Sequence, residues 1–206
     1  MTPYVIIFIT ILSFLLNLLA AQKCSNLITQ TRKSNMSGDE LAKWILIKNK
    51  KRHIKIVQTE IIGENLYDPL LKVIQFGPDV YGKKTIYSIA VGSHEACHAL
   101  RFQYFRFLFI PISVIAKYIF IPLLLGSLLF NLPVLHGTVL ILYVGLILIK
   151  LQIEVYDEIK INQLSIRLLS QNKLITDTEL LETKKLYRFF NYTYFVSLPL
   201  KIVLNR

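Results

Sequence analysis

Four long apolar stretches constrain this chain of 206 residues more than any other feature. They cover residues 4–21, 110–130, 132–151 and 189–204. The first three are long enough to cross a bilayer as helices, whereas the fourth is short and aromatic and suits either a span or an interfacial helix. The hydrophobic content of 53% exceeds that of soluble domains. The sequence therefore predicts a mainly α-helical membrane protein with three to four transmembrane helices.

The first apolar stretch predicts an uncleaved membrane anchor at residues 1–21. No lysine or arginine precedes it, so the positively charged start of a secretory signal is missing. Lys23, directly before Cys24, does not fit a lipoprotein cleavage site.

The net charge of +11 is concentrated in two polar stretches, 23–106 and 160–188, each flanked by apolar segments. This is the distribution of the positive-inside rule, and it predicts that both polar stretches face the cytoplasm. We expect these basic residues to meet anionic lipid rather than nucleic acid. Cys24 and Cys97 form no disulfide framework, which is consistent with a reducing compartment.

The most specific motif is His94-Glu95-Ala96-Cys97-His98. Histidines four residues apart on a helix share one face and can bind one metal ion. The glutamate between them would sit beside the open metal position, where it can take a proton from a water molecule. A purely structural histidine pair would not need that glutamate. The motif predicts a zinc site with Glu95 as the general base.

A catalytic zinc needs a third protein ligand. Three acidic residues of the amino-terminal portion have no distinguishing pattern, namely Glu60, Glu64 and Asp68. Glu154 and Glu158, after the third apolar stretch, are better placed. A tight hairpin around residues 131–133 would return the chain to the side of the membrane that His98 occupies. The two glutamates share a helix face, and the residues alone favour neither as the ligand.

The polar parts predict a small α+β zincin-like portion. Capping-box spacings begin at Ser37 and Thr176 and predict helix starts there. Other patterns predict strands within 53–62 and 72–76, a turn at 64–69, and a helix from Lys84 through the metal motif to Leu100 and beyond. The strand before this helix is either an edge along which an extended substrate pairs or part of a shielding hairpin.

An ordered series of segments resembles one family, the YugP-like membrane-bound neutral zinc metallopeptidases, over residues 36–185. The matching segments are Met36–Ala42, Tyr67–Pro69, Pro78–Tyr81 and His94–Ala99. Downstream, the stretch that begins at Glu158 resembles the third-ligand helix of the family. The resemblance thus implies Glu158 as the ligand, a zinc cofactor and a metalloendopeptidase activity.

Four positions depart from the usual pattern of that family. Cys97 stands where a glycine is common, and we interpret it as a small packing residue. Lys160, Ile161 and Asn162 stand where an aspartate and small residues are usual. The departures at Cys97, Lys160 and Ile161 motivate an alternative function, a catalytically silent zinc-binding membrane scaffold or holdase.

We therefore expect His94, His98 and Glu158 to bind zinc and Glu95 to act as the catalytic base on a peptide or protein substrate. Oxyanion stabilisation is left open among Tyr67, Tyr81, Tyr156 and His53. A motif inside a membrane span is disfavoured, because Ser93, Glu95 and Arg101 make its surroundings polar. The sequence does not indicate an oligomeric state.

The predicted organisation has five parts in an integral membrane protein of a bacterial inner membrane, with the active site facing the cytoplasm. They are the anchor 1–21, a metallopeptidase portion 22–106 with the HExxH helix, a transmembrane hairpin 107–151, a third-ligand helix and cytoplasmic segment 152–188, and a carboxy-terminal transmembrane or interfacial helix 189–206.

Overall fold

The computed structural model describes residues 33–101 and 111–204 and five single positions nearer the amino terminus, with the side chains of 194–204 excepted. The predicted anchor at 1–21 falls almost entirely outside the described residues. The chain forms two compact units. We call them the hairpin unit (Met1–Leu19, Gln103–Asp157 and Thr193–Arg206) and the sheet unit (Ala20–Phe102 and Glu158–Tyr192).

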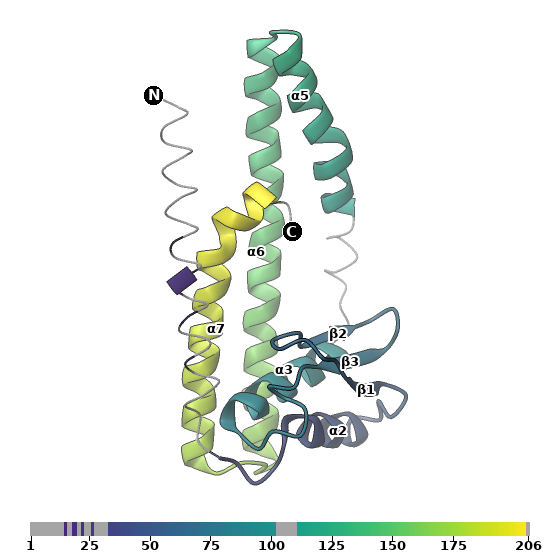
Figure 1. Ribbon diagram of the computed structural model, residues 1–206, viewed down its shortest axis with the longest axis vertical. Helices are drawn as coiled ribbons and strands as arrows, with labels where there is room; N and C mark the ends of the chain where they lie inside the picture. The colour runs from purple at the N-terminus through teal and green to yellow at the C-terminus, as the bar shows by residue number, and fades with distance from the viewer. Residues whose placement is uncertain are drawn as a thin grey trace. The chain divides into compact units, whose positions relative to one another are not determined.

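Helix α2, Gly38–Lys48, is the first helix in the continuously described part of the sheet unit (Figure 1). The capping box predicted at its start is confirmed, because the Ser37 hydroxyl accepts from the Glu40 amide and the Glu40 carboxylate accepts from the Ser37 amide. Leu41, Ala42 and Ile45 then fall on one helical face and are fully buried. This face packs against helix α3.

A three-stranded sheet follows, with strands β1 (Lys55–Gln58), β2 (Leu66–Asp68) and β3 (Val73–Phe76). Their order is β1-β3-β2, with β1 parallel and β2 antiparallel to β3. The predicted strands within 53–62 and at 72–76 are confirmed as β1 and β3.

The predicted turn at 64–69 was wrong, since Leu66–Asp68 pairs along β3 as strand β2. Three residues are too few for a period of two to stand out in sequence. The same topology excludes one of the two alternatives for the strand before the metal helix, namely that it offers a free edge. That strand is β3, which is paired on both sides, and the edge strands are β1 and β2.

Helix α3, Ile86–Leu100, carries the metal motif. Thr85 caps its start, since its hydroxyl accepts from the Ser88 amide at 3.1 Å. The helix ends at Leu100 rather than beyond it, because Arg101 adopts an extended conformation. Gly92 lets α3 approach α2 closely, and a Cβ atom at this position would collide with the carbonyl oxygen of Gly38.

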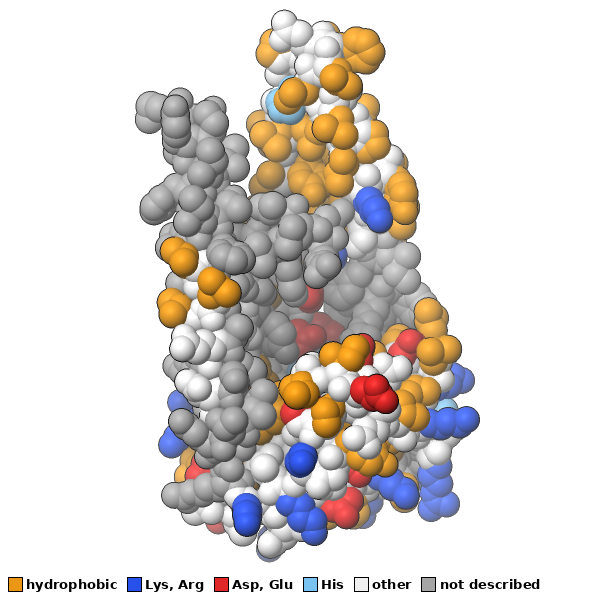
Figure 2. Space-filling model, viewed as in Figure 1, with side chains coloured by type: hydrophobic (Ala, Val, Ile, Leu, Met, Phe, Trp, Pro, Cys, Tyr) orange, Lys and Arg blue, Asp and Glu red, His pale blue; other side chains and the backbone are white. Residues whose placement is uncertain are grey.

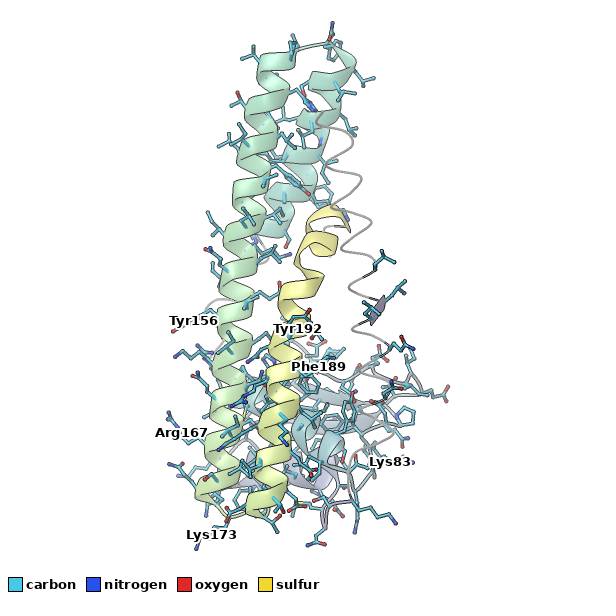
Figure 3. The ribbon with its side chains drawn as sticks, turned by 90° about the vertical axis from the view of Figure 1, so that its left-hand side faces the viewer. Lys83, Tyr156, Arg167, Lys173, Phe189 and Tyr192 are labelled. Atoms are coloured by element: carbon cyan, nitrogen blue, oxygen red, sulfur yellow. The ribbon has the colours of Figure 1, made fainter. Side chains whose placement is uncertain are left out.

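Two further helices complete the sheet unit, the end of α6 (Pro133–Gln171) and the start of α7 (Asp177–Leu204). Figures 1 and 3 show these parts side by side, with Arg167 on α6 and Phe189 on α7. The capping box predicted at Thr176 is confirmed, because the Thr176 amide donates to the Glu179 carboxylate and the Thr176 hydroxyl accepts from the Glu179 amide. Leu169, Leu186 and Tyr187 join the hydrophobic core of α2 and α3.

The hairpin unit contains helix α5, Ile121–Leu129, preceded by a π-helical segment at Ala116–Phe120, and the first part of α6. The predicted tight turn at 131–133 lies between them, and Asn131 adopts a positive φ of 51° there. The Ser127 hydroxyl and Nδ1 of His136 lie 2.9 Å apart across the turn.

Two helices in the described part of the chain are long and apolar enough to cross a membrane, Pro111–Leu129 and Pro133–Gln171. Only 11% and 22% of their most apolar windows are buried, and Figure 2 shows exposed apolar side chains in this part of the chain. Helix α6 has 39 residues, about twice what a span needs. The protein is thus mainly helical with one small sheet, and three to four spans remain a prediction.

Candidate metal centre

Helix α3 positions the two histidines of the predicted motif. His94 and His98 are one turn apart on one face, and only 7% and 3% of their surfaces are exposed. Their Nε2 atoms lie 3.0 Å apart. Two nitrogen lone pairs repel at that distance, so one nitrogen must carry a hydrogen or a cation must lie between them.

Helix α6 brings the third predicted ligand, Glu158, to the same point. Its Oε2 lies 3.1 Å from Nε2 of His94, and its Oε1 lies 3.6 Å from Nε2 of His98. Ligand atoms of the three residues all lie within 4.8 Å of one another. Within the described residues this is the one such group, and Glu154, the other carboxylate left open by the sequence, is not part of it.

The separations fit a tetrahedral zinc site. Zinc binds nitrogen and carboxylate ligands at about 2.0–2.2 Å, which places neighbouring ligand atoms about 3.3 Å apart. The observed separations of 3.0, 3.1 and 3.6 Å lie around this value. In addition, the buried Oε2 of Glu158 has no hydrogen-bond partner among the described residues, an expensive state for a carboxylate oxygen. A cation bound between the three side chains would satisfy it.

Asn162, one turn after Glu158 on α6, sets the protonation pattern of His94. Its Oδ1 lies 2.8 Å from Nδ1 of His94. Because an amide oxygen only accepts, Nδ1 must donate, and the neutral ring then has its lone pair on Nε2. Nε2 is the atom that faces His98 and Glu158. A hydrogen bond of this kind orients histidine ligands in metal sites.

The charges around His94 favour a positive species at this point. Burial by itself would lower the pKa of His94, because it penalises the charged imidazolium. The Glu158 carboxylate, 3.1 Å from Nε2 of His94, and the charge of Glu95 outweigh burial and raise the pKa of His94 above its ordinary value. A proton and a metal ion would compete for the same nitrogen.

Two histidines and one carboxylate suit zinc in hydrolases, and the same donor set also suits ferrous iron in oxygenases. The comparison with known families favours zinc. A family model described as "Putative neutral zinc metallopeptidase" matches residues 2–204. The chain belongs to this neutral zinc metallopeptidase family. The resemblance that the sequence motifs indicated is thereby confirmed. No curated protein and no solved structure matches the chain.

Glu95, the predicted general base, lies between the two histidines of the motif on α3. It lies next to His94 on α3, and only 8% of it is exposed. Its negative charge contributes to the raised pKa of His94, which places it in the electrostatic environment of the candidate ligands.

Sequence reasoning missed a buried polar residue that connects the three helices around this candidate metal centre. The Tyr187 hydroxyl on α7 donates to the carbonyl of Ala90 at 2.8 Å and lies 2.5 Å from the Ser165 hydroxyl on α6. It also lies 2.9 Å from the hydroxyl of Ser93, the residue before the first histidine. Tyr187 lies four residues after the buried Thr183 and four before Asn191. This polar stripe at helical spacing is the sequence signal that could have indicated it.

The positions that depart from the family pattern fall in different surroundings. Cys97 and Ile161 are fully buried, as the packing interpretation of Cys97 requires. Burial raises the pKa of the Cys97 thiol far above its usual range, so the thiol stays protonated. Lys160 lines an open hollow with Arg101 and Arg167. Asn162 contacts the candidate ligand His94 directly.

The four oxyanion candidates are spread over the fold. Tyr81 lines a cavity beside α2, His53 is exposed, and Tyr156 is 51% exposed. Tyr67 lies on β2, a strand that contacts α3, and its ring packs against the core. Two of the three amino-terminal carboxylates have other partners. Glu64 accepts from the Thr59 hydroxyl, and Asp68 accepts from the amides of the following turn.

Proposed function

We propose that this chain is a membrane-embedded zinc metalloendopeptidase that hydrolyses peptide bonds. The observation that carries the proposal is the convergence of three ligand atoms, Nε2 of His94, Nε2 of His98 and a carboxylate oxygen of Glu158, within 4.8 Å. Membership of a zinc metallopeptidase family supports zinc as the ion. The burial of Glu95 on the same helix supports hydrolysis as the reaction.

In this proposal His94, His98 and Glu158 hold the ion and leave one position open to water and substrate. Zinc, when bound, supplies a Lewis acid that polarises the peptide carbonyl and acidifies water. Glu95 accepts the proton of the attacking water and passes it to the departing amine nitrogen. Asn162 keeps the His94 ring oriented with its Nδ1 hydrogen turned away from the ion.

The position of the sheet supports an extended substrate. Strand β2 is an edge of the sheet and contacts α3, the helix of the metal motif. An extended peptide that adds to this edge would pair its backbone with β2 beside the metal helix. We therefore assign the role of substrate platform to β2.

The membrane part of the proposal rests on Pro111–Leu129 and Pro133–Gln171, whose apolar windows are mostly exposed. We propose that these helices span the bilayer and that lipid covers them. The basic charge of the sheet unit supports an active site that faces the cytoplasm, with anionic lipid rather than nucleic acid as its partner. The bacterial inner membrane stays part of the proposal.

The decisive variant is Glu95→Gln, assayed for zinc content and for cleavage of a peptide library. Glutamine keeps the size of the side chain and cannot act as the base. We expect unchanged zinc and a loss of cleavage of at least about a hundredfold. Glu60→Gln, at an exposed glutamate of the same unit, is the matched control and should cleave normally. Full cleavage by Glu95→Gln would overturn the mechanism.

The same assay tests the alternative function. Asn162 contacts His94 where the family pattern has a small residue, so the surroundings of the site differ from those of its relatives. A catalytically silent zinc scaffold or holdase would bind zinc, lose stability on chelation and release no product from any peptide. Turnover by the wild-type chain that Glu95→Gln abolishes would exclude it.

A further inference from the structure

Two asparagine side chains form a chain of hydrogen bonds that ends at His94. Asn162 on α6 bonds Nδ1 of His94 through its Oδ1 at 2.8 Å. Its Nδ2 donates to Oδ1 of Asn191 on α7 at 2.7 Å. Asn162 is 2% exposed, so water cannot substitute freely for these partners.

The side-chain amide of Asn162 has two ends of opposite character. With the oxygen toward His94, Nδ1 of the ring donates and Nε2 keeps its lone pair for a metal ion. With the NH2 group toward His94, Nδ1 would have to accept, and the ring hydrogen would move to Nε2. That hydrogen would point at His98 and Glu158 and would block ligation.

We propose that Asn191 is a positioning residue that fixes the amide orientation of Asn162 and thereby presets His94 for metal binding. The oxygen of Asn191 attracts the NH2 end of the Asn162 amide, which leaves its oxygen end for His94. A carboxylate at position 162 would need no such partner, because both of its oxygens accept. Because the side chain of Asn162 is a neutral amide, the metal site depends on a residue of α7, Asn191, which lies 29 positions further along the chain.

This inference rests on the proposed metal site but not on catalysis, so its test uses zinc affinity and ring protonation in the full-length chain. Zinc affinity is measured by competition with a fluorescent chelator for wild type, Asn191→Ala, Asn162→Asp and the double variant. Asn172→Ala is the matched control, because the side chain of that asparagine donates to the carbonyl of Leu168, away from the metal ligands.

We expect Asn191→Ala to weaken zinc binding by about tenfold, as is usual for residues that orient a metal ligand. In the Asn162→Asp background the same substitution should change affinity by less than about twofold. Asn172→Ala should leave affinity unchanged. If Asn191 only packs against α6, its loss will weaken binding equally in both backgrounds, and that outcome overturns the proposal.

Nitrogen-15 NMR of histidine-labelled, zinc-free protein at alkaline pH gives the second readout. The His94 ring should carry its hydrogen on Nδ1 in wild type and as a mixture of the two tautomers in Asn191→Ala. A wild-type ring protonated on Nε2 would overturn the proposal. Because this spectrum needs neither zinc nor turnover, it decides the role of Asn191 even if the wild-type chain binds no zinc and the proposed function fails.

Discussion

The hydroxyl of Tyr187 lies 2.9 Å from that of Ser93, the residue directly before the first candidate metal ligand. The two residues are 94 positions apart, on helices α7 and α3. The same tyrosine bonds Ser165 on α6. One buried hydroxyl thus joins the three helices around the candidate metal centre. Burial raises the pKa of Tyr187 well above its usual range, so the group stays a neutral donor.

Tyr187→Phe should therefore destabilise the sheet unit while the ring still fills its place. Removal of the hydroxyl leaves the Ser165 hydroxyl without its buried partner, at a cost of about 1–3 kcal/mol in the free energy of unfolding. Chemical denaturation of the zinc-free protein measures this cost. Tyr192→Phe is the control, because Tyr192 is 56% exposed, and it should change stability by less than about 0.5 kcal/mol. Equal effects of the two variants would contradict the role of Tyr187.

Gly92→Ala should also destabilise the protein, because its new methyl group would meet the backbone of α2. A Cβ atom at this position would collide with the carbonyl oxygen of Gly38, and a backbone group cannot rotate away as a side chain can. We expect a loss of at least about 1–3 kcal/mol in the free energy of unfolding. Gly145→Ala, a helical glycine with open space around its Cβ, should be neutral or gain up to about 1 kcal/mol. A stable Gly92→Ala would show that α2 and α3 do not approach this closely.

His98→Ala should abolish the stabilisation that zinc provides. A ligand present at about a thousandfold its Kd raises the free energy of unfolding by about 4 kcal/mol, provided that it binds only the folded state. Wild type should show this gain, and so should His53→Ala, which changes an exposed histidine. Thermal melting with and without zinc measures it. A full gain in His98→Ala would mean that zinc binds elsewhere.

The contribution of His94 to stability and the stabilisation by zinc should change in opposite directions as the pH rises. The raised pKa of His94 means that the folded zinc-free protein holds this proton more tightly than the unfolded chain. Its contribution is full below the ordinary histidine pKa of about 6.5 and is lost as the pH rises through the folded value. Zinc needs the unprotonated ring, so the increment from zinc grows over the same range. Denaturation with and without zinc at several pH values measures both, and a zinc increment that falls as the pH rises would contradict this assignment.

Much of the local structure was predictable because local patterns determine it. The capping boxes at Ser37 and Thr176 fixed two helix starts, and the spacing of His94 and His98 placed both rings on one face. Strand β2 could not be foreseen in this way, since its three residues become a strand only by pairing with β3.

The contacts that complete the candidate site were out of reach for a different reason. Asn162 lies 68 positions from His94, and Asn191 lies 29 positions from Asn162. No local periodicity encodes which helices meet, although the spacing of four residues from Glu158 does place Asn162 on the ligand face. Glu158 itself was preferred over Glu154 only through the family resemblance. The structure brings Glu158 into the group, and its role as a ligand stays a prediction.

The proposed metal centre is tested most directly by the zinc content of the purified full-length chain and of two glutamate variants, measured by elemental analysis after removal of loosely bound metal. We predict one zinc ion per wild-type chain, the same in Glu154→Ala, and almost none in Glu158→Ala. The two glutamates are one turn apart on α6, so helix propensity and local charge change equally in both variants. A full complement of zinc in Glu158→Ala, or a loss confined to Glu154→Ala, would contradict the proposed metal centre.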